Sequence, residues 1–212
     1  MACIDIDVHH GNGQQSIFYS RSDVLTISMH MHQGAWDEGT AHPETGGSDE
    51  VGVGEGIGYN LNIPLDLGFG DSEYIEAFEQ LVVPAVNDFK PTFLIVCCGV
   101  DGSCVDTLGR QTLTMAGFFA MAAGCRKLAD AHASGRCVVT QEGGYSLSYA
   151  AYCVHAVLEG IAGRDCSQLR DPLDGTYPNP ALRDPQNERV KALVLRLRAE
   201  REAAIAAARA AR

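Results

Sequence analysis

Short apolar runs alternate along this chain with longer stretches of helical periodicity, and this alternation restricts the fold more than any other feature. The apolar runs predict strands at residues 2–8, 24–29, 93–98 and 137–140, and alternation of polar and apolar residues predicts one at 59–65. Helices are predicted at about 71–87, 114–132 and 148–161. The run at 93–98 is apolar throughout, as in a central parallel strand. The alternation predicts an α/β fold with a mostly parallel sheet and helices on both faces.

The chain is expected to form one folded domain over residues 1–163, followed by a loop rich in Asp, Pro and Gly over 164–184. An amphipathic helix is expected over 185–212, packed on the domain or on a partner. Because the chain opens directly on a strand of buried character, we expect the N-terminal part of the domain to be missing.

Composition narrows the class of protein. The chain has 212 residues, of which 46% are hydrophobic, and a formal net charge of -11. This is enough apolar material for one core, and the negative charge disfavours direct binding of nucleic acid. The eight cysteines include no Cys-x-x-Cys pair, which favours reduced thiols and a cytoplasmic protein. No apolar stretch is long enough to predict a membrane partner.

Acidic and histidine side chains follow two of the predicted strands. Asp5, Asp7 and His9 alternate with apolar residues at the end of the first strand, and Asp101 follows the strand at 93–98. Ligands of open parallel sheets bind beyond the carboxyl ends of the strands. Asp7, His9 and Asp101 therefore predict a zinc site with three protein ligands and an open fourth position, as in catalytic zinc centres.

Two glycine-containing segments could have a function, one at residues 143–145 and one at residues 51–58. Gly143 and Gly144 allow a sharp turn that would direct Tyr145 over the sheet end, where a phenol could stabilise an oxyanion, although a lone tyrosine is more often a packing residue. The glycine-rich segment 51–58 resembles a phosphate loop. A strand follows it, however, and no Gly-Lys-Ser/Thr is present, so a loop at the rim of a pocket is the better interpretation.

Taken together, these segments resemble the histone deacetylase family. The matching stretches are Asp-Ile-Asp-Val-His-His-Gly-Asn-Gly (5–13), Val-Leu-Thr-Ile-Ser-Met-His (24–30), Gly-Glu-Gly-Ile-Gly-Tyr-Asn-Leu-Asn-Ile-Pro-Leu (54–65), Gly-Val-Asp-Gly with Asp106 and Leu-Gly (99–109), and Glu-Gly-Gly-Tyr-Ser (142–146). Their order and spacing match from residue 1 to about 163. The Glu-Gly-Gly-Tyr form is similar to the class II branch and to bacterial amidohydrolases, including relatives that act on acetylpolyamines.

The resemblance implies an arginase/deacetylase-type three-layer fold and a set of site residues. Asp7, His9 and Asp101 match the zinc ligands, and Tyr145 matches the tyrosine that assists the transition state. A second ion, usually potassium, is implied at the side chains of Asp5 and Ser28 and the carbonyls of Asp7, His9 and Met29.

This sequence also departs from the family pattern. The family carries a tandem His-His pair upstream of the first strand, which acts as general base and acid. His9-His10 is not that pair, because His9 matches a metal ligand. Gly-Val-Asp-Gly replaces the usual Gly-Phe-Asp-Ala around Asp101. The second manganese of the related arginases would require aspartates where Gly11 and Gly99 stand, so one metal is expected.

The expected function is zinc-dependent hydrolysis of an amide, removing an acetyl or similar acyl group from lysine side chains or polyamines. Absence of the upstream histidines would slow it, by about 10²–10⁴-fold for lost acid–base help. The alternative is an inactive homologue that binds metal or a partner chain. Formation of a homo-oligomer is left open.

Overall fold

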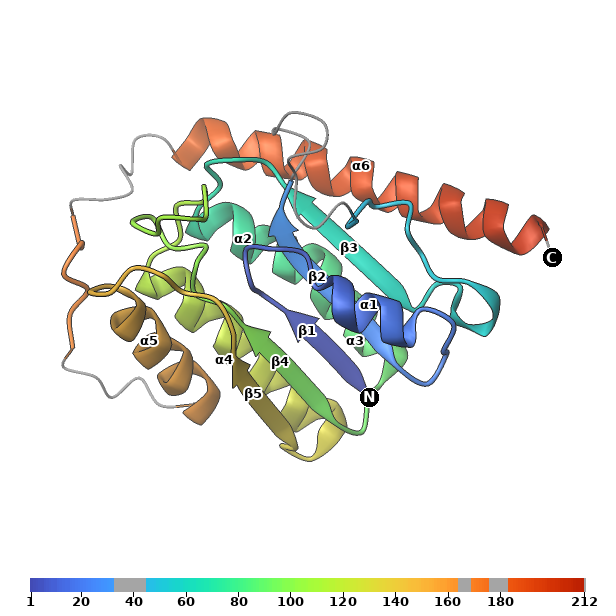
Figure 1. The fold of residues 1–212 in the computed structure, drawn as a ribbon, viewed down its shortest axis with the longest axis horizontal. Coiled ribbons are helices and arrows are strands. Elements are labelled where there is room, and N and C mark those ends of the chain that lie inside the picture. Colours follow the sequence, from blue (N-terminus) through green and yellow to red (C-terminus); the bar gives the residue numbers. More distant parts are fainter. Residues whose placement is uncertain (33–44, 164–168, 176–182, 212) are drawn as a thin grey trace.

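A single parallel sheet organises the molecule. The computed structural model describes residues 1–212 except 33–44, 164–168, 176–182 and 212. Five strands lie in the order β3-β2-β1-β4-β5, and every neighbouring pair is parallel (Figure 1). The strands are β1 (Ala2–Asp5), β2 (Leu25–Met31), β3 (Asn60–Leu65), β4 (Leu94–Cys98) and β5 (Cys137–Gln141). The predicted α/β class with a parallel sheet is confirmed.

Helices connect the strands and cover the sheet. They are α1 (Asn12–Phe18), α2 (Asp71–Ala77), α3 (Val83–Phe89), α4 (Met115–Ala133), α5 (Ala150–Ala162) and α6 (Arg183–Ala210), with a short 3₁₀ helix at Gly54–Gly56. In Figure 1, α2, α3 and α4 lie behind the sheet and α1 lies in front of it. No described helix is both long enough and apolar enough to cross a lipid bilayer.

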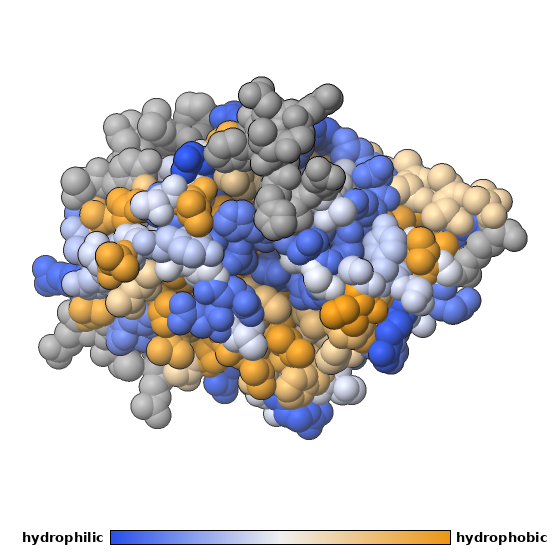
Figure 2. All heavy atoms as spheres, in the orientation of Figure 1, coloured by the Kyte–Doolittle hydropathy of each residue, from blue (hydrophilic) through white to orange (hydrophobic). Residues whose placement is uncertain are grey.

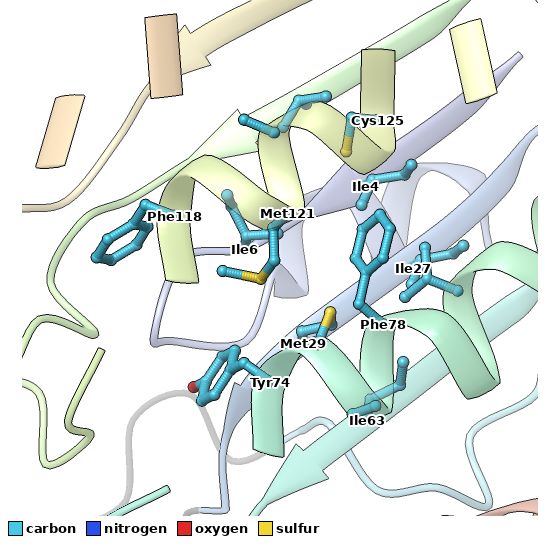
Figure 3. Close-up of a cluster of buried hydrophobic side chains, with 14 of the residues drawn as sticks. Ile4, Ile6, Ile27, Met29, Ile63, Tyr74, Phe78, Phe118, Met121 and Cys125 are labelled. Atoms are coloured by element: carbon cyan, nitrogen blue, oxygen red, sulfur yellow. The ribbon is translucent and has the colours of Figure 1, made fainter. Parts of the chain in front are cut away.

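The two faces of the sheet differ sharply in polarity. The register aligns Ile4 with Ile27 and Val96, and Ile27 with Leu61, so apolar side chains fill the rear face. Figure 3 shows the same cluster closed by residues of the helices behind it, among them Tyr74, Phe78, Phe118, Met121 and Cys125. Polar side chains occupy the front face of β1, β2 and β3 instead: Asp5, Thr26, Ser28, His30, Asn60 and Asn62. The front face is therefore where chemistry can be placed.

The predicted helix at 71–87 is continuous, with a π-helical turn, Phe78–Val82, between α2 and α3. Pro84 has no N–H to donate to the carbonyl of Gln80, four residues earlier. Nη2 of Arg198 donates to that carbonyl at 2.5 Å. The terminal helix α6 thus satisfies a backbone acceptor that the proline leaves free.

The terminal helix packs on the domain. Val190, Leu193, Val194 and Leu197 recur at helical spacing and are all buried. Figure 1 shows α6 running along the β3 side of the molecule. Of the two packing partners considered for this helix, the structure shows the domain itself.

Candidate metal centre

The first strand ends where aspartate side chains accept hydrogen bonds from the backbone N–H groups that follow it. The sequence predicted a strand to Val8, but β1 ends at Asp5. Oδ1 of Asp5 accepts from the N–H of Asp7 at 3.0 Å, and Oδ1 of Asp7 accepts from the N–H of His9 at 2.8 Å. Such local bonds compete with ladder bonds and turn the chain. The predicted alternation persists beyond the strand, since Ile6 and Val8 are buried.

The turn brings three predicted ligands together. Nδ1 of His9 lies 3.2 Å from Oδ1 of Asp7 and 3.0 Å from Oδ2 of Asp101. One ligand atom from each residue falls within 4.8 Å of the other two. Asp101 arrives from the loop after β4, and its Oδ1 accepts from the N–H of Val8 at 3.0 Å. The carboxyl ends of β1 and β4 therefore supply one compact group of two carboxylates and an imidazole.

The electrostatics of this group favour a cation. Burial raises the pKa of Asp101, whose side chain is fully inaccessible to solvent. Burial also acts to raise the pKa of Asp7, but hydrogen bonds from His9 and from the N–H of Gly143 lower it overall. Hydrogen bonds to Asp101 and then to Asp7 raise the pKa of His9 to about 10. In this arrangement the imidazolium offsets one of the two carboxylate charges, whereas a divalent metal ion could offset both.

Two glycines leave room for the carboxylates. A Cβ at position 99 would lie 2.0 Å from Oδ2 of Asp7, and one at position 143 would lie 2.3 Å from Oδ2 of Asp101. A Cβ at position 11 would likewise lie 2.3 Å from Oδ2 of Asp5. An aspartate at 11 or 99 would not fit without displacing these side chains, which argues against the arginase-like pair of metal ions.

Tyr145 stands on a turn held by Asp106. Oδ2 of Asp106 accepts from the N–H of Tyr145 at 2.7 Å and from that of Ser146 at 3.2 Å. The N–H of Val100 donates to the carbonyl of Gly143 at 2.8 Å, which fastens the start of the turn to β4. The Tyr145 side chain is 49% exposed, and its pKa is raised by burial and then by the negative charges of Asp101 and Asp7. Its phenol stays protonated at neutral pH and is available as a donor.

The residues expected to hold a monovalent cation lie beside the first group. Oδ2 of Asp5 accepts from Nε2 of Gln14 at 2.8 Å, and Oγ of Ser28 accepts from the N–H of Gly11 at 3.2 Å. Met29 is buried with its side chain on the rear face. Burial raises the pKa of Asp5 well above its usual value, so this side chain also lacks a compensating charge.

The hydrogen-bond network on the front face of the sheet was not predicted from the sequence. Helix α1 was not predicted, yet its Gln15 accepts at Oε1 from Nδ2 of Asn60 at 2.8 Å and from Nδ2 of Asn62 at 2.9 Å. His10 is buried, with Nε2 3.1 Å from the same oxygen, and its other ring nitrogen is 2.9 Å from Oγ1 of Thr45. The amide side chains of Gln15, Asn60 and Asn62 were the sequence feature from which this network could have been predicted. His10 is thereby committed to this network.

Asp7 and His9 line an open depression of about 250 Å³, together with Asp5, His10, Gly11, Gln14, Cys97 and Glu142, whereas Asp101 is fully buried and does not line it. Figure 2 shows hydrophilic residues gathered in the middle of this side of the molecule. A ligand can therefore reach Asp7 and His9 from the front of the sheet.

Comparison with known proteins shows the family to which this arrangement belongs. The profile of the histone deacetylase domain matches residues 1–161. The chain is 47% identical over 178 residues to "Histone deacetylase 8" of Arabidopsis thaliana, covering 84% of this chain and 46% of that protein. It is 42% identical over 197 residues to a "Histone deacetylase-like amidohydrolase" of Pseudomonas aeruginosa, covering 91% and 50% respectively.

Solved structures agree. The crystal structure of the HDA15 HD domain superposes with a TM-score of 0.74 at 32% identity, covering 99% of this chain and 52% of that one. The structure of the histone deacetylase Clr3 gives 0.76 at 30% identity, over 94% of this chain and 31% of the other. The chain thus spans about half the length of the curated relatives described above. Its fold is the arginase/deacetylase fold, and the chain belongs to the histone deacetylase family.

Proposed function

We propose that this chain carries the metal centre of a zinc-dependent deacetylase that removes an acetyl or similar acyl group from lysine side chains or polyamines. The observation that carries the proposal is the meeting of Asp7, His9 and Asp101 within 4.8 Å at the carboxyl end of the sheet. The name of the Pseudomonas relative, an amidohydrolase, supports an amide as the bond that is cleaved.

Zinc fits the donor set. An imidazole with two carboxylates is a borderline ligand group, and three protein ligands leave a position for substrate or water. A zinc ion held there would polarise an amide carbonyl and acidify a bound water. The glycines at 99 and 143 keep the space around the carboxylate oxygens free of side chains.

Tyr145 is proposed as the donor to the oxyanion that forms when water attacks the amide. A protonated phenol beside negative carboxylates can donate a hydrogen bond but resists ionisation. Donors of this kind contribute about 10²–10³-fold to the rate in other hydrolases. The phenol of Tyr145 keeps its proton in that hydrogen bond, so it is unchanged at the end of the reaction.

A potassium ion at Asp5, Ser28 and the carbonyls of Asp7, His9 and Met29 is proposed as a structural partner of the zinc. The buried Asp5 carboxylate beside Asp7 and Asp101 supports it, since a second cation would offset a third negative charge in a small volume.

The second candidate is a chain that binds metal, or a partner chain, without turnover. The observation that favours it concerns the acid–base groups. The only tandem histidines in the sequence are His9 and His10. His9 lies between the two carboxylates, and His10 is bonded to Gln15 and Thr45. Neither imidazole is left over as a general base.

We propose the cytoplasm as the location, since the seven cysteines among the described residues are all unpaired. Direct contact with nucleic acid is not proposed, given the net charge of -11. Assembly into a homo-oligomer stays open.

The test combines metal binding with turnover. The chain is stripped of metal, titrated with Zn²⁺ by calorimetry, and assayed on acetyl-lysine peptides and acetylpolyamines. We expect one zinc per chain, with Asp101→Asn and His9→Gln each weakening it at least about tenfold. Asp130→Asn is the matched control, because Asp130 is an exposed carboxylate paired with Arg126. Two manganese ions per chain would contradict the single-zinc proposal.

Turnover separates the two candidates. Deacetylation that falls about 100-fold in Tyr145→Phe supports the enzyme. Zinc binding without deacetylation supports the non-catalytic candidate. Equal affinity of zinc for the Asp101→Asn variant and for the unmodified chain would contradict the proposed zinc site, on which the enzyme and the metal-binding form of the second candidate both depend.

A further inference from the structure

A second cavity lies at the opposite end of the sheet from the metal centre. It has a volume of about 560 Å³ and is bounded by the start of β2, the segment before β3, the end of α3 and the last turns of α6. The metal centre lies at the carboxyl ends of the strands, whereas Leu25 and Tyr59 of this cavity lie at their amino ends. Nothing in the proposed hydrolysis uses this space.

One wall of the cavity is a guanidinium group with incomplete hydrogen bonding. Nη2 of Arg201 donates to the carbonyl of Gly58 at 2.6 Å. Its Nε is buried and has no hydrogen-bond partner. Burial lowers the pKa of Arg201, and the only charge that offsets this belongs to its neighbour Glu202. A desolvated cation with a free donor is costly unless an acceptor with negative charge is supplied.

A second guanidinium stands close to the same glycine. A Cβ on Gly58 would lie 3.8 Å from Nη2 of Arg209, so the groups of Arg201 and Arg209 both approach this residue. Among the described residues, neither arginine takes part in an ion pair with a carboxylate. The chain as a whole has a net charge of -11, but two unpaired guanidinium groups at one cavity make this region locally positive.

The remaining lining residues indicate the apolar character and the net charge of a ligand that would fit this cavity. Tyr59 and Phe89 meet edge to face at 5.8 Å between ring centroids, and Ile205 adds an aliphatic surface. Asp88 also lines the cavity. Its carboxylate disfavours a multiply charged anion, while two guanidinium groups and one carboxylate leave a single positive charge to be balanced.

We propose that this cavity binds a small organic monoanion, a carboxylate attached to an apolar or aromatic body. The carboxylate would accept from the guanidinium groups of Arg201 and Arg209, and the body would lie against Tyr59, Phe89 and Ile205. Arginine suits this role because its planar donors match the two oxygens of a carboxylate. The proposal does not depend on metal binding or on deacetylation.

The probe is benzoate, compared with its uncharged isostere benzamide and with benzylamine. Binding is measured by calorimetry on the full chain, without added metal. We expect saturable binding of benzoate with a Kd on the order of 1 mM or tighter. Benzamide and benzylamine should bind at least about tenfold more weakly, because they lack the charge that the guanidinium groups require.

Variants decide whether the cavity is responsible. Arg209→Gln should weaken benzoate binding at least about tenfold, and Arg201→Gln at least as much. Arg209 is exposed, so its substitution preserves the fold even where Arg201→Gln does not. Arg196→Gln is the matched control, since Arg196 lies on the same helix, is largely exposed and pairs with Glu200; it should leave binding unchanged.

The proposal would be overturned by the absence of saturable benzoate binding, by equal binding of benzamide, or by benzoate binding that Arg209→Gln does not weaken. Tighter binding of inorganic phosphate than of benzoate would show that the class of ligand is wrong.

Discussion

Asp106 connects two turns through four backbone donors. Its Oδ1 accepts from the N–H groups of Leu108 and Gly109, and its Oδ2 accepts from those of Tyr145 and Ser146. The first turn follows the Asp101 loop and the second carries the proposed oxyanion donor. A single carboxylate therefore fixes the position of the turn that carries Tyr145 relative to the proposed metal ligands.

We expect Asp106→Ala to loosen the Tyr145 turn without harming the metal ligands. Each lost hydrogen bond contributes about 1 kcal/mol, so protection of the Tyr145 and Ser146 amides from hydrogen exchange should fall about tenfold or more. Zinc affinity should stay within a few fold. Thr107→Ala, at the exposed neighbouring position, is the control. Unchanged protection of both amides in Asp106→Ala would show that the contacts are dispensable.

The raised pKa of His9 predicts how the metal-free chain responds to pH. Hydrogen bonds to Asp101 and Asp7 raise this pKa from 6.5 to about 10. A raised folded-state pKa gives stability that is present in full below about pH 6.5 and is lost as pH rises through about 10. Urea unfolding with a chelator present should therefore show stability falling between these values.

His9→Gln isolates this contribution, and its stability should change less over the same pH range. Bound zinc reverses the trend, because zinc displaces the His9 proton and so binds more tightly as pH rises. A variant that follows the wild-type pH profile would refute the assignment to His9.

At the scale of elements, α4 and α5 are held close by a glycine. A Cβ at position 160 would lie 2.6 Å from the carbonyl oxygen of Phe119 and 2.8 Å from Cβ of Ala122. Both contacts involve the main chain or the first side-chain atom of α4, which cannot rotate away. The spacing of the two helices thus depends on the absence of a side chain at this position.

Gly160→Ala should destabilise the chain by about 1–3 kcal/mol through overpacking. Gly13→Ala is the matched control, since Gly13 lies within α1 and a Cβ there would meet nothing within 4 Å. That change should be neutral or should stabilise by up to about 1 kcal/mol, through the higher helix propensity of alanine. Chemical denaturation of both variants checks the difference. Equal effects would mean that α4 and α5 can separate at little cost.

The predictability of each element depended on whether a local pattern or a distant contact defines it. Short apolar runs, and the alternation at 59–65, located all five strands to within a few residues, because a buried strand needs apolar side chains on at least one face. The end of β1 was misplaced, since it depends on Asp5 and Asp7 bonding to their own backbone. The π-helical turn was not predicted, and neither was the hydrogen bond that Arg198, more than a hundred residues away, donates to the carbonyl of Gln80 within it.

The candidate site was predictable for a similar reason. Asp7, His9 and Asp101 follow strands that the sequence locates, and parallel strands bring such ends together. The supporting contacts of Asp106 and Gln15 were not predicted, because they join loops whose geometry only the folded chain defines. The identity of the bound ions and the role of Tyr145 stay predictions.

At the scale of the whole molecule, the front of the sheet is covered unevenly. Helix α1 and the polar network lie over β1, β2 and β3, whereas Val138 of β5 is 47% exposed and Ile95 of β4 is half-buried. Figure 2 shows an apolar area below the hydrophilic centre of this side, where Figure 1 places β4 and β5. Strand β5 is also the last strand of the sheet on this side. An exposed edge beside an apolar surface favours association between chains.

Val138→Lys should therefore reduce concentration-dependent association while leaving the fold intact. Lysine on an edge strand opposes pairing with another strand. Light scattering after gel filtration, over a range of protein concentrations, measures the effect. Leu158→Lys is the control, since Leu158 is exposed on helix α5 and not on the edge strand. Association that responds only to Leu158→Lys would place the contact elsewhere.

The pairing of β1 with β4 has a consequence for how the chain is handled in the laboratory. The register aligns Asp5 with Cys97, which places Asp7 beside Gly99 and brings its carboxylate close to Asp101. A shift of this register by one residue would turn the carboxylates toward the apolar face of the sheet and separate the proposed ligands. During refolding from denaturant, capture of zinc would then report correctly paired chains specifically, and could be used to separate them from misaligned ones.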